Sequence, residues 1–492
     1  MTLRFASLIA LLEVTACSLG GGTVSLGSGS LARAGGASGV AGSGDGSAGS
    51  SAMATGGGLN VDPEPVDVVC PDGQKTTVSG TVYDPRGAIP LYNAVVYVPS
   101  VRGELPPFPN TVDCEKCKDP VSAKVATLTG PDGHFSLEGV PVGNVELVVQ
   151  MGKWRRLQTV SVSKACQDNP LPDDEPSRLR LPRTRAEGSI PKIALSTGHS
   201  DALECLLRKI GIADSEFTTD AGEGRVNLFV GCEGDQANKH TGASRFAASL
   251  GGGSFPATNQ LFSAGNLNKY DVVIFSCEGH KCDTIQTPDN VAQLVSFANQ
   301  GGRVFLDHDH YNWLNHANAP IESAAQFSSG EDIPSPLATQ INTSFPKGEA
   351  FAAWLRNVQA SRSLGALDIY DARSSVQSLS PNRAQSWIYR SEAPIGSFYF
   401  TIGTPVAEKD SDPAPEACGR VVFTDLHVSK GELAALPGGG SSDFSDQDTP
   451  FPGGCMTTAL SAQEKALEFM LFDLTSCVQQ ETAVPTPPVI LK

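Results

Sequence analysis

Positive charge and long apolar segments are both scarce in this sequence. It carries 36 Lys and Arg residues against 53 Asp and Glu residues, a formal net charge of −17. An acidic chain of this kind repels phosphate backbones and anionic lipid surfaces, so we expect no nucleic-acid partner. No segment approaches the roughly 18 uninterrupted apolar residues that a transmembrane helix needs. The glycine run 251–253 is followed by neither Lys-Ser nor Lys-Thr, which excludes a phosphate-binding loop of that type.

A short apolar run near the start of the sequence ends in a cysteine. Residues 5–12 are too few to span a bilayer but match the apolar core of a signal peptide. Residues 14–17 then read Val-Thr-Ala-Cys, an aliphatic residue and two small residues before a cysteine. This tetrapeptide resembles the lipobox of bacterial lipoproteins, whose cysteine is lipidated and becomes the mature N-terminus. The resemblance implies that a lipid on Cys17 anchors the exported chain to a membrane.

The residue after the cysteine bears on where such an anchor would lie. Ser18 stands there rather than Asp, which fits the outer membrane of a Gram-negative cell envelope. The alternative interpretation is an ordinary signal peptide cleaved near Ala16, which would release the protein instead of anchoring it. Both interpretations predict export.

Composition and length divide the rest of the chain into a tether and folded parts. From position 18 to about 58 the sequence is nearly all Gly, Ser and Ala, which cannot bury enough apolar surface to order itself. We therefore expect a disordered tether over 18–65. The roughly 430 remaining residues suffice for two or three domains. The predicted divisions are a β-sandwich over 66–181, a linker over 182–191, an α/β domain over 192–477 and a disordered tail over 478–492.

The first predicted domain consists of short alternating segments separated by turn residues. Segments such as 77–83 alternate apolar and polar residues, and Gly-Pro-Asp-Gly at 130–133 is a turn signal. This pattern predicts an antiparallel β-sandwich. Gly-Thr-Val-Tyr-Asp at 80–84, Thr-Gly-Pro-Asp-Gly-His-Phe at 129–135 and Gly-Val-Pro-Val-Gly at 139–143 resemble the carboxypeptidase regulatory-like domain, a transthyretin-like sandwich. In that family the domain is an accessory without catalytic residues, and the resemblance implies the same here.

Twelve cysteines in a chain with an export signal predict disulfides. If Cys17 is lipidated, eleven remain, four before the linker and seven after it, so pairing within domains leaves at least one free thiol in the second domain. Cys114 and Cys117 form a Cys-x-x-Cys pair in a Pro-rich insertion, where we favour disulfide bonding over a zinc or redox site. The disulfide candidates are Cys70, Cys114, Cys117, Cys166, Cys277, Cys282, Cys418, Cys455 and Cys477.

The second predicted domain alternates buried strands with amphipathic helices. Residues 192–197 and 303–307 are continuous apolar strand patterns, each next to a segment with helical periodicity. The alternation predicts an α/β fold with a doubly wound, mostly parallel sheet. Tyr-Asp-Val-Val-Ile at 270–274, the segment 294–304 and Gly-Arg-Val-Val-Phe-Thr-Asp-Leu-His at 419–427 are similar to the trehalose-utilisation (ThuA-like) and class I glutamine-amidotransferase-like superfamily. The resemblance implies a flavodoxin-type, amidotransferase-like fold.

That resemblance also implies a catalytic cysteine on a turn after a strand. In glutamine amidotransferases the nucleophile lies in a Gly-x-Cys-x-Gly motif, and a later histidine is its base. Residues 275–279 read Phe-Ser-Cys-Glu-Gly, and His427 falls near the position of the family's histidine. The candidate catalytic residues are therefore Cys277, His427 and Glu278.

Two residues depart from the family's pattern, and a nearby cysteine could block the thiol. Phe275 replaces the first glycine, and its bulk would crowd the sharp turn that glycine permits. Ser429 stands where the family has the glutamate that holds the histidine. A disulfide between Cys277 and the nearby Cys282 would also silence the thiol. The sequence therefore favours a domain that has lost the family's chemistry.

A cluster of histidine and aspartate follows the next predicted strand. Residues 307–310 read Asp-His-Asp-His, so strand alternation would place the two histidines on one face and the two aspartates on the other. Ligands of doubly wound folds bind at the carboxyl ends of strands, and imidazole pairs bind divalent metals there. A divalent metal and a solvated polar loop are the two interpretations. The candidate metal ligands are Asp307, His308, Asp309 and His310, with His427 or Glu278 completing the shell.

Two functions are compatible with these patterns. The favoured one is a cell-envelope lipoprotein of binding or scaffold type, membrane-attached through its lipid, with a non-catalytic amidotransferase-like domain. The alternative is a secreted hydrolase that uses Cys277 with His427, or a metal held by His308 and His310. The sequence does not identify the ligand.

The lipid anchor can be tested directly. We expect labelled palmitate to be incorporated into the wild-type protein in a Gram-negative host but not into the Cys17→Ala variant, because only the cysteine sulfur accepts the lipid. Autoradiography of the purified proteins measures this. Equal labelling of both proteins would mean that residues 1–17 are an ordinary secretion signal.

Overall fold

The described part of the protein is rich in β-structure, with several sheets and few helices. A computed structural model describes residues 63–103, 105–232, 241–263, 265–317, 320–409, 412–413, 415–427 and 448–491. Cys17, the rest of the predicted signal peptide, nearly all of the predicted tether and Ser429 lie outside the described residues. Within the described residues, no helix is both long enough and apolar enough to cross a membrane.

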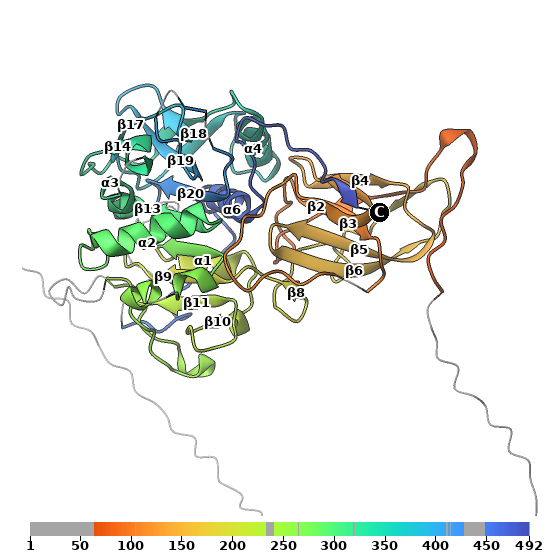
Figure 1. Ribbon diagram of the computed structural model, residues 1–492, viewed down its shortest axis with the longest axis horizontal. Coiled ribbons are helices and arrows are strands. Elements are labelled where there is room, and N and C mark those ends of the chain that lie inside the picture. The colour runs from red at the N-terminus through yellow and green to blue at the C-terminus, as the bar shows by residue number, and fades with distance from the viewer. Residues whose placement is uncertain are drawn as a thin grey trace, which may run out of the picture. The chain divides into compact units, whose positions relative to one another are not determined.

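The first half of the described chain holds a six-stranded and a three-stranded sheet (Figure 1). Their strand orders are β21-β3-β2-β5-β6-β8 and β4-β1-β7. Val78 and Phe135 from the small sheet share an apolar core with Val96 and Leu147 from the large one, as a β-sandwich requires. The strands are β1 Thr77–Thr81, β2 Val95–Pro99, β3 Val121–Leu128, β4 His134–Glu138, β5 Gly143–Met151, β6 Trp154–Val162, β7 Asp168–Pro170, β8 Gly188–Ser189 and β21 Ile490–Leu491.

The C-terminal segment is part of this sandwich, so the prediction of a disordered tail over 478–492 was wrong for its described residues. Val478 forms a bridge with Lys116, and β21 pairs in parallel with β3. Pairing with β3 satisfies backbone donors and acceptors that a free tail would leave to water. The three prolines of the segment, at 485, 487 and 488, disfavour a strand and concealed this pairing. The predicted linker likewise contributes β8 to the sheet edge.

The second half is organised around a ten-stranded sheet of order β10-β11-β9-β12-β13-β20-β19-β18-β15-β16. The pairings from β10 to β20 are parallel, whereas those from β20 to β16 are antiparallel. The expectation of a mostly parallel sheet therefore holds for one side only. A short loop joins β18 to β19, and such a connection permits only antiparallel pairing. The strands are β9 Ile193–Ser196, β10 Phe217–Thr218, β11 Val226–Phe229, β12 Val272–Phe275, β13 Arg303–Asp307, β15 Leu337–Ile341, β16 Ala366–Ile369, β18 Ala384–Arg390, β19 Gly396–Thr404 and β20 Gly419–Thr424, with a separate pair, β14 Ala325–Phe327 and β17 Val376–Leu379.

Both faces of this sheet are covered. Alternate residues of a strand point to opposite faces, so Leu195 joins one apolar core while its neighbour Ala194 joins the other. The first core includes residues of α1, α4 and α6, and the second includes one face of α2 (Figure 1). The helices are α1 Leu203–Lys209, α2 Pro288–Asn299, α3 Asn312–Asn315, α4 Pro346–Asn357 and α6 Ala462–Thr475. Short 3-10 helices span Pro71–Gly73, Asp214–Glu216, Ala248–Leu250, Thr258–Phe262, Leu267–Lys269, His308–Tyr311 and Ile321–Ala324.

Disulfides confirm the expectation of an oxidised, disulfide-bonded chain, but their pairing crosses the predicted domain boundary. The Cys-x-x-Cys cysteines bond to the second half, in Cys114–Cys418 and Cys117–Cys477. The insertion that carries them lies along the α/β half, where the Val112 N–H donates to the Asn268 carbonyl at 2.9 Å. Pairing within domains was therefore the wrong assumption. The other disulfides are Cys70–Cys166, Cys205–Cys455 and Cys232–Cys282, and Cys277 is a free thiol.

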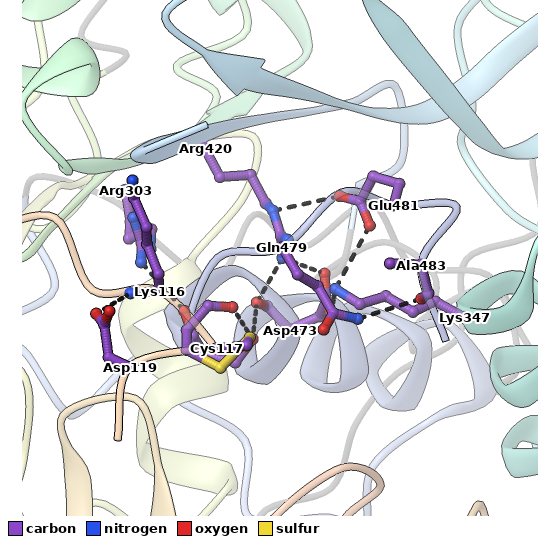
Figure 2. Close-up of a disulfide and its surroundings, with 12 residues drawn as sticks. Lys116, Cys117, Asp119, Arg303, Lys347, Arg420, Asp473, Gln479, Glu481 and Ala483 are labelled. Carbon is purple, nitrogen blue, oxygen red and sulfur yellow. Dashed lines mark hydrogen bonds and ion pairs between the residues drawn. A yellow bond between two sulfur atoms is a disulfide. The ribbon is translucent and has the colours of Figure 1, made fainter. Parts of the chain in front are cut away.

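Beside the Cys117–Cys477 disulfide, a buried ion network joins α6 to β20 and to the C-terminal segment (Figure 2). Asp473 accepts from Arg420 Nη1 at 2.6 Å and from Lys347 Nζ at 2.8 Å. Glu481 lies 3.3 Å from Arg420 Nε. Burial alone would raise the pKa of Asp473, but Arg420 and Lys347 outweigh it and lower that pKa. These charges tolerate burial because each has partners of opposite sign.

A second buried carboxylate lies on the opposite side of α6 and faces the sandwich. Glu468 meets Asp84 of the sandwich, and both residues are fully buried. Burial raises the pKa of Asp84 to about 6. Burial and the neighbouring Asp84 raise the pKa of Glu468 well above its usual range. Two carboxyl groups in contact cannot both ionise without strong repulsion. The junction therefore holds a proton that the unfolded chain would release near pH 4.

Removing one of these carboxyls should flatten the pH dependence of stability. A pKa that is higher in the folded state means that stability is lost as pH rises from about 4 through 6 and beyond. We expect Glu468→Gln, whose amide can donate to Asp84, to raise the free energy of unfolding at pH 8 by on the order of 1–3 kcal/mol. Denaturant unfolding at pH 5 and pH 8 measures this. The exposed Glu392→Gln is the control, and a uniform effect of Glu468→Gln at both pH values would contradict the shared proton.

Candidate functional site

Three side chains meet where three neighbouring parallel strands end. Cys277 follows β12, His308 follows β13 and His427 follows β20, and these strands are adjacent in the sheet. Parallel strands bring their carboxyl ends to one edge, so residues 119 positions apart in sequence, such as His308 and His427, become neighbours. Two of these residues, Cys277 and His427, were predicted catalytic candidates, and His308 was a predicted metal ligand.

The three functional atoms converge on a single point. Cys277 Sγ lies 3.2 Å from His308 Nδ1, and the same nitrogen lies 3.2 Å from His427 Nε2. All three atoms lie within 4.8 Å of one another. The two imidazole rings meet edge to face, with an interplanar angle of 90°. The relative exposures are 0% for Cys277, 2% for His308 and 5% for His427, so the cluster is shielded from bulk water.

Asp371, which the sequence analysis missed, orients His427. Its Oδ2 lies 3.2 Å from His427 Nδ1, on the side of the ring opposite His308. Asp371 has a positive φ of 51°, a left-handed conformation that costs energy for a residue with a side chain. Gln463 of α6 holds the neighbouring backbone, since its amide donates to the carbonyls of Tyr370 and His427. An isolated aspartate after a strand carries no motif, so only the fold reveals this partner.

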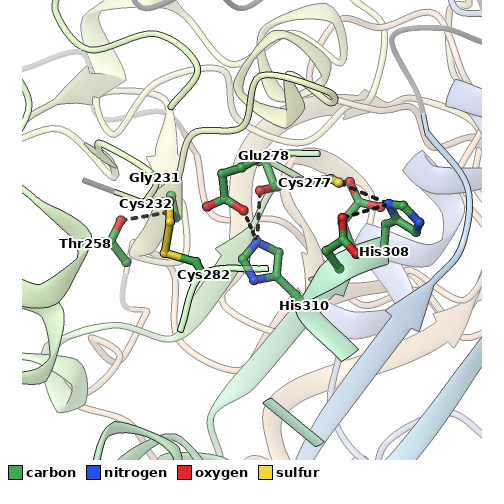
Figure 3. Close-up of polar contacts among 12 residues, drawn as sticks. Gly231, Cys232, Thr258, Cys277, Glu278, Cys282, His308 and His310 are labelled. Atoms are coloured by element: carbon green, nitrogen blue, oxygen red, sulfur yellow. Dashed lines mark hydrogen bonds and ion pairs between the residues drawn. A yellow bond between two sulfur atoms is a disulfide. The ribbon is translucent and has the colours of Figure 1, made fainter. Parts of the chain in front are cut away.

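His308 and His310 do not share a face, which corrects the strand-alternation prediction. β13 ends at Asp307, and His308 begins a 3-10 helix with a positive φ of 48°. His310 lies instead beside Glu278, whose Oε2 is 2.9 Å from His310 Nε2, as Figure 3 shows. Trp313 Nε1 donates to His310 Nδ1 at 3.2 Å, which leaves the ring proton on Nε2. The predicted ligands are thereby divided between two buried groups.

Glu278 and His310 form a buried pair separate from the three-atom cluster. Burial lowers the pKa of His310, but the contact with Glu278 raises it more. His310 Nε2 also lies 3.0 Å from the Ser276 carbonyl. This pair therefore supports the backbone on either side of Cys277 and provides no atom to the cluster.

Carboxylates surround the thiol. The Cys277 N–H donates to Asp307 Oδ2 at 3.2 Å, and Asp309 Oδ2 lies 3.7 Å from His308 Nδ1. Burial and the neighbouring Asp307 raise the pKa of Cys277 well above its usual value. Burial likewise raises the pKa of Asp425 to about 7, although Ser375 donates to it. Burial and the neighbouring Asp201 also raise the pKa of Asp307, and Arg373 Nη1 lies 3.8 Å from Asp309 Oδ2. The burial of this region therefore favours the neutral forms of the thiol and of Asp307.

Close backbone contacts fix the position of Cys277. Its carbonyl accepts from the N–H groups of Ser200 at 3.0 Å and Asp201 at 3.1 Å, and the Gly279 N–H donates to Sγ at 3.2 Å. A Cβ on Gly198 would lie 2.3 Å from the Cys277 carbonyl oxygen, so the loop after β9 approaches as closely as glycine allows.

The predicted disulfide involving Cys277 is absent. Cys282 bonds to Cys232 instead, and this disulfide ties the loop after β12 to the end of β11 (Figure 3). Phe275 does not crowd the turn, because its ring packs at 4.9 Å from Trp313 in the apolar core. The bulk of Phe275 is therefore accommodated, and the thiol remains unpaired.

Comparisons with known proteins are uninformative about this site. No protein-family model matches the chain, and no curated protein matches it. Two solved chains show a weak similarity, both from mutants of a type II cohesin–X-dockerin complex of Acetivibrio cellulolyticus. The C-terminal interface mutant has 15% identity, covers 30% of this chain and 79% of its own, and has a TM-score of 0.15. The N-terminal interface mutant has 13% identity, covers 30% and 78%, and has the same TM-score of 0.15, too low to relate either fold to this one.

The packing around Cys277 makes its accessibility testable. We expect Gly198→Ala to displace the Cys277 backbone, since its Cβ has no room, and so to increase the rate of Cys277 alkylation by iodoacetamide at least about tenfold over wild type. Peptide mapping after timed alkylation measures this. Gly253→Ala is the matched control, because a Cβ there meets nothing within 4 Å. Equal alkylation of Cys277 in both variants would show that the thiol is not enclosed by the β9 loop.

Proposed function

We propose that this chain is a cell-envelope lipoprotein of the binding type, anchored by a lipid on Cys17. Its second half has an amidotransferase-like fold without acyl-transfer chemistry. The observation that carries the proposal is the local structure around Cys277: a long loop, rather than a helix, follows the cysteine, and α2 begins only at Pro288. A nucleophile elbow needs a strand, a sharp turn and a helix in direct succession.

Three more features separate Cys277 from an acylating nucleophile. The thiol is fully buried, whereas a nucleophile must reach a substrate carbonyl. In a nucleophile elbow the nucleophile itself lies on the strained turn. Here the positive φ belongs to His308, and Cys277 is not among the residues with positive φ. His427, the expected base, lies 3.2 Å from His308, and the hydrogen-bond partner of the thiol is His308. These features favour binding over catalysis.

The strand order supports the fold assignment. If the two-residue edge strand β10 is left out, the parallel strands β9, β11, β12, β13 and β20 occupy the order 2-1-3-4-5 in the sheet. That is the order of flavodoxin-type doubly wound folds, which bind ligands at the carboxyl edge where the direction of the strand order switches. β12 lies at that switch and carries Cys277 at its end. The cluster therefore occupies the usual ligand position of such a fold.

Export is supported by the covalent structure of the described chain. Five disulfides, two of them between the halves, need an oxidising compartment outside the cytosol. The sandwich, similar in sequence to carboxypeptidase regulatory-like domains, then serves as an accessory that holds the α/β half. A lipid on Cys17 would place both at a membrane surface.

The hydrolase remains a second candidate because of one specific observation. Cys277, His308, His427 and Asp371 form a continuous chain of polar contacts, thiol to imidazole to imidazole to carboxylate, each of 3.2 Å. A nucleophile activated through a base and an orienting acid has the same components.

Covalent trapping discriminates the two candidates. We expect full-length protein in detergent, incubated with p-nitrophenyl acetate, to form no acyl adduct on Cys277 and to hydrolyse the ester no faster than Cys277→Ala does, because the buried thiol cannot reach the carbonyl. Intact-mass and peptide mass spectrometry, with absorbance of the released p-nitrophenol, measure this. A burst of product with an adduct on Cys277 would overturn the proposal in favour of the hydrolase.

A further inference from the structure

Two contacts of the cluster compete for a single nitrogen of His308. His308 Nδ1 lies 3.2 Å from both Cys277 Sγ and His427 Nε2, yet one ring nitrogen has either one proton or one lone pair. If His427 Nδ1 donates to Asp371, the neutral ring presents a lone pair toward His308. A single His308 proton can then serve only one of its two neighbours. Three electron-pair donors facing one point are, by contrast, what a cation requires.

Two of the three distances between these atoms match the ligand shell of a small tetrahedral ion, and the third, from Cys277 Sγ to His427 Nε2, is no more than 4.8 Å. Zn²⁺ binds thiolate sulfur at about 2.3 Å and imidazole nitrogen at about 2.0–2.1 Å, which places tetrahedral ligand atoms roughly 3.3–3.6 Å from one another. The observed 3.2 Å separations fall within a few tenths of an ångström of these edges. The ligand types, one sulfur and two imidazoles, are those that borderline-soft divalent ions prefer over Mg²⁺ or Ca²⁺.

The surroundings supply the outer shell of such a site. The carboxylate of Asp371 contacts Nδ1 of His427, the ring nitrogen farther from His308. This contact fixes the tautomer in which Nε2 can bind a metal ion. The Gly279 N–H donates to Cys277 Sγ, an interaction that stabilises a thiolate (Cys277 and His308 in Figure 3). Asp307 accepts from the Cys277 N–H and so holds the backbone that carries the sulfur.

We propose that Cys277, His308 and His427 bind a borderline-soft divalent cation, with Zn²⁺ as the best-fitting ion, and that Asp371 positions His427 for it. This inference names the ligand of the binding role proposed above and rests on that role. The sequence pattern pointed to a different set, His308 with His310, but His310 lies with Glu278 and contributes no ligand atom. Three protein ligands leave the fourth position of a tetrahedral ion to water or a small anion.

Metal titration of the full-length protein in detergent tests the site. After removal of metal by a chelator, we expect one Zn²⁺ to bind per chain, and Co²⁺ to give both ligand-field bands and a thiolate-to-cobalt charge-transfer band. Cys277→Ser should lose the charge-transfer band, and His308→Ala should bind Zn²⁺ at least about 100-fold more weakly. Asp371→Asn should weaken binding about 10–100-fold, as expected for a residue that orients a ligand.

Two further variants separate loss of a ligand from loss of structure. His427→Cys retains a soft ligand and should retain Zn²⁺, and His316→Ala, at an exposed histidine, should bind as wild type does. Failure of wild-type protein to bind stoichiometric Zn²⁺, or a Co²⁺ complex without thiolate charge transfer, would overturn the metal site. If Cys277 is also inert toward the activated ester in that case, the binding role itself stands; acylation of Cys277 would overturn both.

Discussion

The nearly complete burial of α6 is the constraint on which the rest of this structure depends. Every residue of the helix except Ala462 and Lys465 is buried, because the sheet lies on one side and the sandwich on the other. Phe469 stacks on Tyr92 of the sandwich and packs 4.7 Å from Phe351 of α4. A helix buried on all sides must find a partner for each polar residue it carries, since an unpaired buried charge is costly. Two acids of α6 meet that requirement through ion pairs, Glu464 with Lys209 and Asp473 with Arg420 and Lys347. For the third, Glu468, burial and the neighbouring Asp84 raise the pKa, which favours the neutral form.

The cluster at the carboxyl edge depends on the same helix. Gln463, in the first turn of α6, donates to the Tyr370 and His427 carbonyls and accepts from the Tyr370 N–H at 2.8 Å. It therefore couples the loop that carries Asp371 to the loop that carries His427. Because Asp371 and His308 both have strained, left-handed backbones, the surrounding packing has to hold them in place. Strain concentrated at two residues of one cluster is typical of a site that is organised before its ligand arrives.

The disulfides and the ion network make the two halves a single unit. Cys114–Cys418 and Cys117–Cys477 close long stretches of chain, with sequence separations of 304 and 360 residues, and such closures restrict the unfolded ensemble most. The C-terminal segment crosses from α6 to β3 of the sandwich beside Cys477. These two covalent links hold the sandwich and the α/β half together.

Much of this architecture could be predicted from local patterns, since alternation, turn residues and apolar strands are local properties of the chain. The sandwich strands, the parallel strands β9, β12 and β13, and the importance of Cys277, His308 and His427 all follow from such patterns. The partners of these residues do not. His310 leaves the cluster because β13 ends at Asp307, and Asp371 enters it from a loop without any motif. The disulfide pairs, the β21 strand and the antiparallel side of the sheet likewise depend on contacts between distant segments. The sequence by itself determined most of the strands and the candidate residues that follow them, whereas only the tertiary structure decided which side chains meet, because convergence depends on strand order and backbone conformation.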